Sequence, residues 1–106
     1  MTELWIKITP TMQPTIVAEG GEDDITLEQM QEAVGGYIEY CTFAPNTPFP
    51  VPNKDGNMVI GSIINVIANE EGALMGLKAN TLGTYAANGT LETTRVIVGD
   101  VLVHVR

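Results

Sequence analysis

Residue types on which active sites depend are scarce in this chain of 106 residues. It has a single cysteine, Cys41, and a single histidine, His104, so a zinc site would lack ligands. A nucleophilic triad would lack partners unless His104 lay beside Cys41. Otherwise we expect Cys41 to pack as a small apolar residue and His104 to be a half-exposed strand residue. We therefore expect no enzyme, and neither a metal nor a cofactor.

Basic residues are also few: five Lys and Arg stand against thirteen Asp and Glu, giving a net charge of −8. Nucleic-acid binders need bases to neutralise phosphates, so direct binding of DNA or RNA is disfavoured. The charge is uneven, with −7 in residues 1–53 and −1 in residues 54–106. Six acids and no base lie between Glu19 and Glu32. Such a run either faces solvent or meets a basic partner.

Long apolar runs are absent as well. No window approaches the roughly 18 apolar residues that a membrane span needs. The start, MTELWIKITP, has an early acid and no apolar stretch, unlike a secretory signal. With one cysteine, an internal disulfide is excluded, which favours a reducing cytoplasm. Since 44% of the residues are hydrophobic, we expect residues 1–106 to form a single domain around one core.

Periodicity and turn residues indicate a small α+β fold with a mainly antiparallel sheet. One helix is clear, because Thr26 and Gln29 form a capping-box pattern and Gly35 can close the helix. A short second helix is expected over residues 79–87. The predicted strands cover residues 4–9, 15–19, 37–43, 58–68, 94–98 and 101–105.

Proline gathers in one place: four of the six prolines fall in APNTPFPVPNKDGN. Alternate prolines favour extended polyproline geometry and remove the donors of a sheet ladder. We therefore predict a proline-rich exposed loop over residues 44–57, serving either as an interaction arm or as a tolerated insertion.

The stretch NVIANEEGALMGLKAN allows two interpretations. In the first, Asn69 starts a β-turn, Gly72 supplies a positive φ that other residues resist, and Glu70 and Glu71 point to water. In the second, amides and carboxylates form a site for a polar ligand edge, such as a sugar diol or a purine amine. The ligand-binding residues would then be Tyr37, Asn69, Glu70, Glu71 and Asn80.

Three pieces of the sequence together resemble a family of small uncharacterised domains of bacteriophages and bacterial mobile elements. They are TLEQMQEAVGGYIEY, NEEGALMGLKAN and VIVGDVLV, and the resemblance covers most of the chain outside the proline-rich loop. Thr81 stands where that family commonly has an arginine after the asparagine. The resemblance carries no assigned reaction. It implies a phage accessory role in the cytoplasm of the host.

Two functions follow as expectations. The first is a non-enzymatic phage accessory protein that sequesters a small polar ligand, such as a nucleotide-type defence signal. The alternative is an acidic interaction protein that mimics DNA and inhibits a host nucleic-acid-binding protein. Because apolar edge strands of an open sheet often self-associate, a homodimer is expected as well.

Overall fold

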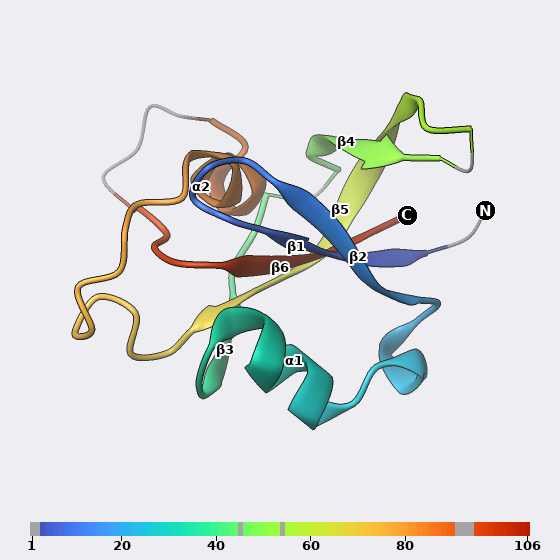
Figure 1. The fold of residues 1–106 in the computed structure, drawn as a ribbon. Helices are drawn as coiled ribbons and strands as arrows, with labels where there is room; N and C mark the ends of the chain where they lie inside the picture. The colour runs from blue at the N-terminus through green and yellow to red at the C-terminus, as the bar shows by residue number, and fades with distance from the viewer. Residues whose placement is uncertain (1–2, 45, 54, 91–94) are drawn as a thin grey trace.

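The computed structural model describes residues 3–44, 46–53, 55–90 and 95–106 and shows an α+β fold. In chain order the elements are β1 (Leu4–Ile8), β2 (Pro14–Glu19), the 3-10 turn η1 (Glu22–Asp24), α1 (Leu27–Val34), β3 (Ile38–Cys41), β4 (Pro48–Pro52), β5 (Met58–Asn69), α2 (Thr81–Asn88) and β6 (Val101–Val105). Figure 1 shows their arrangement. The predicted fold class, with one capped helix and a short second one, is confirmed.

The described strands form one sheet in the order β2-β1-β6-β5-β3, and every pairing among them is antiparallel. β5 is twelve residues long, and its first half also pairs with β4. The strand β6 lies in the middle of the sheet, and all five of its residues are buried. Gly61 allows β5 to pack closely against β4 and against the residue that follows β6. A Cβ at Gly61 would lie 2.8 Å from Val51 Cγ2 and 3.0 Å from the carbonyl oxygen of Arg106.

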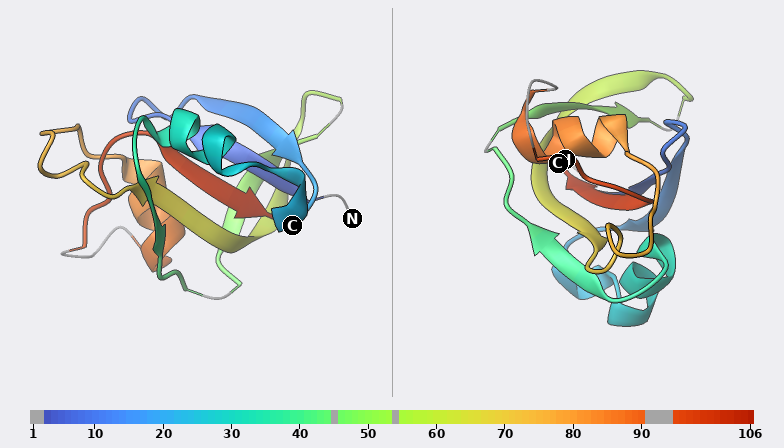
Figure 2. Two further views of the ribbon diagram at one scale, coloured as in Figure 1. Left: turned by 90° about the horizontal axis from the view of Figure 1, so that it is seen from below. Right: turned by 90° about the vertical axis from the view of Figure 1, so that its left-hand side faces the viewer.

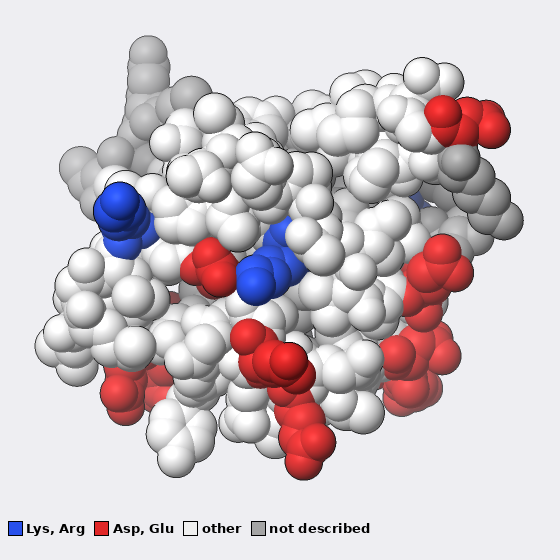
Figure 3. Space-filling view, in the orientation of Figure 1, with Lys and Arg blue, Asp and Glu red and all other residues white. Residues whose placement is uncertain are grey.

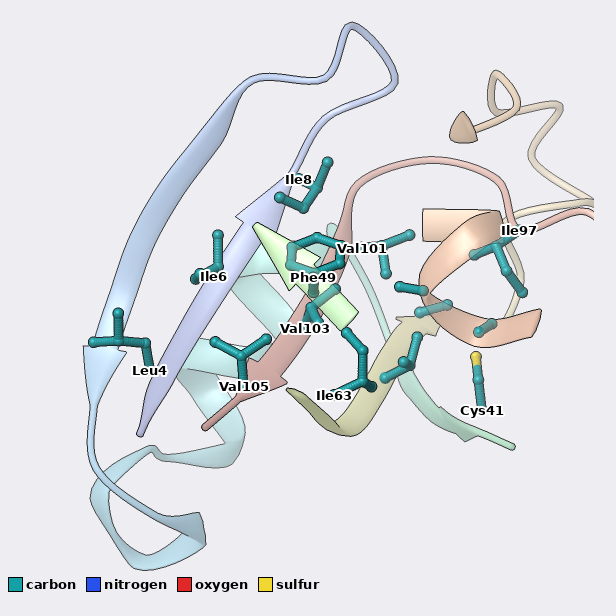
Figure 4. Close-up of a cluster of buried hydrophobic side chains, with 14 of the residues drawn as sticks. Leu4, Ile6, Ile8, Cys41, Phe49, Ile63, Ile97, Val101, Val103 and Val105 are labelled. Carbon is teal, nitrogen blue, oxygen red and sulfur yellow. The ribbon is translucent and has the colours of Figure 1, made fainter. Parts of the chain in front are cut away.

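Both faces of the sheet are covered. On one face, α1 packs Met30 and Val34 against Trp5 and Leu102. On the other face lie α2 and β4, and Figure 4 shows Phe49 of β4 close to Ile6 and Val103. The views in Figure 2 show α1 and α2 on different sides of the sheet. The alternation of β6 explains this arrangement, because successive side chains of a strand point to opposite faces.

The expected exposed loop over residues 44–57 is wrong at its centre, because Pro48–Pro52 form β4. Phe49 is only 1% exposed and Val51 only 8%. The amide of Ile63 donates to Thr47 O, which puts Thr47, Phe49 and Val51 at the hydrogen-bonded positions of the β4–β5 ladder. The prolines occupy the alternate positions, whose nitrogens face away from β5. They therefore block only the outer edge of β4, as prolines in edge strands do.

Two further expectations are corrected. The strand predicted over residues 94–98 is wrong for residues 95–98, which form only a single bridge between Ala79 and Val98. Residue 94 lies outside the described residues. His104 is not half-exposed but 2% exposed, because the face it shares with Leu102 is covered by neighbouring elements. No helix in the described part of the chain is long and apolar enough to cross a membrane.

Candidate functional site

The NEEG segment begins where β5 ends, and the side chain of Asn69 organises it. Asn69 is 5% exposed, and its Oδ1 accepts a hydrogen bond of 2.8 Å from the amide of Glu71. The amide of Gly72 donates to Asn69 O at 3.1 Å. This is a local turn closed by an asparagine side chain, as the first interpretation expected. The positive φ expected at Gly72 is wrong, because Gly72 is not among the glycines with positive φ. Glu70 and Glu71 are both exposed.

NEEG also contacts VGGYIE directly. Asn69 Nδ2 donates to Val34 O at 3.2 Å, and the amide of Glu70 donates to Tyr37 O at 2.8 Å. Gly36 makes this approach possible, because a Cβ at that position would lie 2.9 Å from Asn69 Nδ2. The two motifs are therefore one structural unit that joins the end of α1 to the end of β5.

The side chain of Asn80 is fully buried and ties the third motif to the sheet. Its Oδ1 caps α2 by accepting from the amide of Gly83 at 2.8 Å. Its Nδ2 donates to Ile8 O and to Gly99 O, both at 2.8 Å. Every polar atom of this side chain is thus engaged by backbone groups. Asn80 holds the scaffold, whereas Tyr37, Glu70 and Glu71 present exposed side chains.

Beside this junction lies a cavity of about 290 Å³, which we call the motif hollow. Pieces of all three motifs line it: Val34 and Gly35 from VGGYIE and its helix, Asn69, Met75, Leu77 and Lys78 from NEEGALMGLKAN, and Gly99 and Asp100 from VIVGDVLV. Of the five residues predicted to bind a ligand, the structure places Asn69 in its wall. The other four lie outside the lining.

Charges of both signs surround the motif hollow. Lys78 and Asp100 line it, and Lys7 Nζ lies 3.5 Å from Asp100 Oδ2. The side chains of Lys7 and Asp100 are 32% and 35% exposed, so both reach solvent as well as each other. Val34, Met75 and Leu77 supply apolar surface. The arrangement offers a cation, an anion and an apolar wall to a small molecule.

Sequence reasoning missed most of this lining. Lys78 follows the polar cluster in the sequence, but nothing in its spacing places it beside Asp100. Arg95, the other nearby base in the sequence, donates instead to Thr42 O at 2.9 Å. The available signal was that Gly35 ends a helix, Asn69 ends a strand, and Gly99 lies just before the last strand, where the chain turns.

Cys41 and His104 do not form a catalytic pair. Burial and then the nearby charge of Glu39 raise the pKa of the Cys41 thiol, although Arg95 opposes the change. His104 stacks on Trp5, with ring centroids 3.8 Å apart, and Trp5 belongs to the core beneath α1. Cys41 belongs to the core on the other face of the sheet.

The ring nitrogens of His104 are already engaged. Nε2 lies 2.9 Å from Glu3 Oε1 and 3.1 Å from Gly20 O, while Nδ1 lies 3.1 Å from Asn65 Nδ2. A proton on Nε2 and a lone pair on Nδ1 satisfy all these partners. Among the described residues, no group of three or more His, Cys, Asp or Glu could hold a metal ion.

Comparison of the chain with models of protein families, with curated proteins and with solved structures finds no match. The resemblance to phage and mobile-element domains therefore rests on the three motifs alone. Their contribution to the fold is now defined: they meet at one end of the sheet and line the motif hollow.

Proposed function

We propose that this chain is a non-enzymatic phage accessory protein that acts in the host cytoplasm and sequesters a small polar molecule in the motif hollow. One observation carries the proposal. Three segments far apart in the sequence each contribute residues to one cavity, with Lys78 and Asp100 both in its lining. Small-molecule sites commonly have this character, a mostly apolar concavity with a few charged groups that orient the ligand.

The size and chemistry of the motif hollow narrow the ligand. A volume of about 290 Å³ is just below the usual range of roughly 300–1,000 Å³, so it suits a small ligand. Lys78 can pair with an anion, while Asp100 can accept from an amine or a hydroxyl. Met75 and Leu77 can pack on a flat ring. A nucleoside monophosphate has all three features.

Isothermal titration with adenosine monophosphate and the other ribonucleoside monophosphates tests the proposal. We expect saturable binding of at least one of them, and we expect Lys78→Ala and Asp100→Asn each to weaken it. Arg106→Gln is the control for Lys78→Ala, because it also removes one positive charge but lies outside the hollow. No binding of any nucleotide, or equal loss in the control, would contradict the proposal.

A second candidate function is supported by a different surface. The acids of the run from Glu19 to Glu32 are all exposed, on the end of β2, on η1 and on α1. Figure 3 shows acidic groups gathered over the region that η1 and α1 occupy. This surface suits an acidic protein that inhibits a host nucleic-acid-binding protein by occupying its phosphate sites.

Salt separates the two candidates. Capture of a host protein through exposed acids should weaken steeply as ionic strength rises, because charges at a rim are screened. Replacing Asp23 and Glu28 together by Asn and Gln should have the same effect on host-protein capture. It should leave nucleotide binding in the motif hollow unchanged. If these substitutions lowered the affinity for a nucleotide, the acidic surface would contribute to ligand binding, and the assignment of the two functions to separate surfaces would be wrong.

A further inference from the structure

A second and larger concavity lies away from the three motifs. This apolar groove has a volume of about 500 Å³ and runs between the β2-β1-β6 part of the sheet and the β4–β5 hairpin. Leu4, Ile16, Val51, Ile60 and Val105 are among its lining residues. Val51 and Pro52 of β4 form part of its wall.

Large aliphatic side chains are exposed around the apolar groove. Ile60 is 73% exposed, Val59 is 47% exposed and Ile16 is 46% exposed, and all three line it. Met58, the neighbour of Val59, is 54% exposed. Contiguous apolar exposure of this kind marks an interaction surface, whereas single exposed apolar residues do not.

Among the described residues that line the apolar groove, the charges are balanced, unlike those of the chain. They include one acid, Glu19, and one base, Arg106. Glu19 pairs with Leu4 across β2 and β1, and Leu4 pairs with Val105, the neighbour of Arg106. The acid and the base therefore flank the groove floor, separated by two strand spacings.

We propose that a second copy of this chain covers the apolar groove, forming a twofold dimer. Two copies of net charge −8 repel one another, so they can associate only through a face that is poor in uncompensated acid. In a twofold contact each surface meets itself. Glu19 of one copy then faces Arg106 of the other, twice, around a centre formed by Ile16, Val59 and Ile60.

This contact is made by side chains on a sheet face. Extension of the sheet from β4 is blocked, because Pro48, Pro50 and Pro52 leave no donors on its outer edge. The register of β2 on β1 skips Val17, and a bulge of this kind disrupts pairing along an edge. The groove face provides apolar contact area without requiring a continuous ladder.

Sedimentation velocity from micromolar to millimolar protein tests the dimer. We expect a reversible dimer for the unchanged chain. Ile60→Glu should weaken it by about tenfold or more, because it buries a charge at the centre. Leu74→Glu is the matched control, since Leu74 is 90% exposed but lies outside the groove lining. It should leave the dimer unchanged.

Charge reversal identifies the pairing itself. Glu19→Arg and Arg106→Glu should each weaken association by about tenfold, since each places like charges together, and the double variant should restore it. Circular dichroism melts verify that each variant is folded. A monomer throughout the concentration range would overturn the proposal. So would a dimer insensitive to Ile60→Glu, a double reversal that rescues nothing, or a native mass spectrum showing monomers that retain a small apolar molecule.

Discussion

Replacing Asn80 by Ala removes the side chain that joins three separate parts of the chain. Its Oδ1 caps α2. Its Nδ2 donates to the carbonyl group of Ile8, the last residue of β1, and to that of Gly99, which precedes β6. Asn80 is 0% exposed, so water does not reach these groups in the intact fold. The substitution leaves an amide and two carbonyls without their partner.

The magnitude follows from these contacts. Loss of an N-cap costs about 1 kcal/mol. Leaving a buried acceptor unsatisfied costs roughly 1–3 kcal/mol for each group. The total for the cap and the two carbonyls is therefore at least about 3 kcal/mol, which is a large part of the 5–15 kcal/mol that stabilises a typical domain. A loss of this size lowers the Tm by roughly 12 °C or more.

Urea and thermal unfolding followed by circular dichroism measure this loss. Asn57→Ala is the control, because Asn57 is exposed on the β4–β5 turn, and it should change stability by no more than about 0.5 kcal/mol. If Asn80→Ala is as stable as the control, the hydrogen bonds of Asn80 do not contribute to folding as argued here.

Three other substitutions test separate contacts. Gly36→Ala should destabilise by about 1–3 kcal/mol in urea unfolding, because its Cβ would lie 2.9 Å from Asn69 Nδ2; an unchanged midpoint would mean that Asn69 moves freely. Phe49→Ala should cost about 3–5 kcal/mol, since this side chain of the proline-rich segment is 1% exposed; a neutral result would show that β4 is dispensable. The double variant Glu70→Gln, Glu71→Gln should change the free energy of unfolding by no more than about 0.5 kcal/mol, because both side chains are exposed. A large loss of stability in a thermal melt would show that the carboxylates have structural roles.

Local signals in the sequence were sufficient for the first helix. Thr26 and Gln29 exchange the two hydrogen bonds of a capping box, at 3.1 and 2.8 Å. Gly35 ends the helix with φ 79°, a left-handed conformation that glycine adopts without steric cost. Both features depend on residues within one or two helical turns, so they can be predicted without knowledge of the tertiary structure.

The proline-rich strand and the buried histidine could not be predicted in the same way. Whether prolines at alternate positions prevent pairing depends on which edge of the strand faces a neighbour. In β4 the hydrogen-bonded positions fall on Thr47, Phe49 and Val51, which retain their amides. Burial of His104 depends on Trp5, which is ninety-nine positions earlier in the chain and stacks on its ring.

The candidate site, too, could be predicted from the sequence only in part. The polar cluster identified Asn69 as an important residue, and Asn69 does lie in the wall of the motif hollow. The sequence did not show that the polar atoms of Asn80 bond to backbone groups. Nor did it show that Lys78 and Asp100 share one cavity, because the sheet order brings them together only after folding.

Native mass spectrometry of the protein isolated from infected cells detects whether a ligand occupies the motif hollow. We expect a retained molecule with the mass of a nucleoside monophosphate or a close relative, and its loss in Lys78→Ala while Arg106→Gln retains it. A protein that carries no small molecule in either form, or that carries a host protein instead, would contradict ligand capture in the motif hollow.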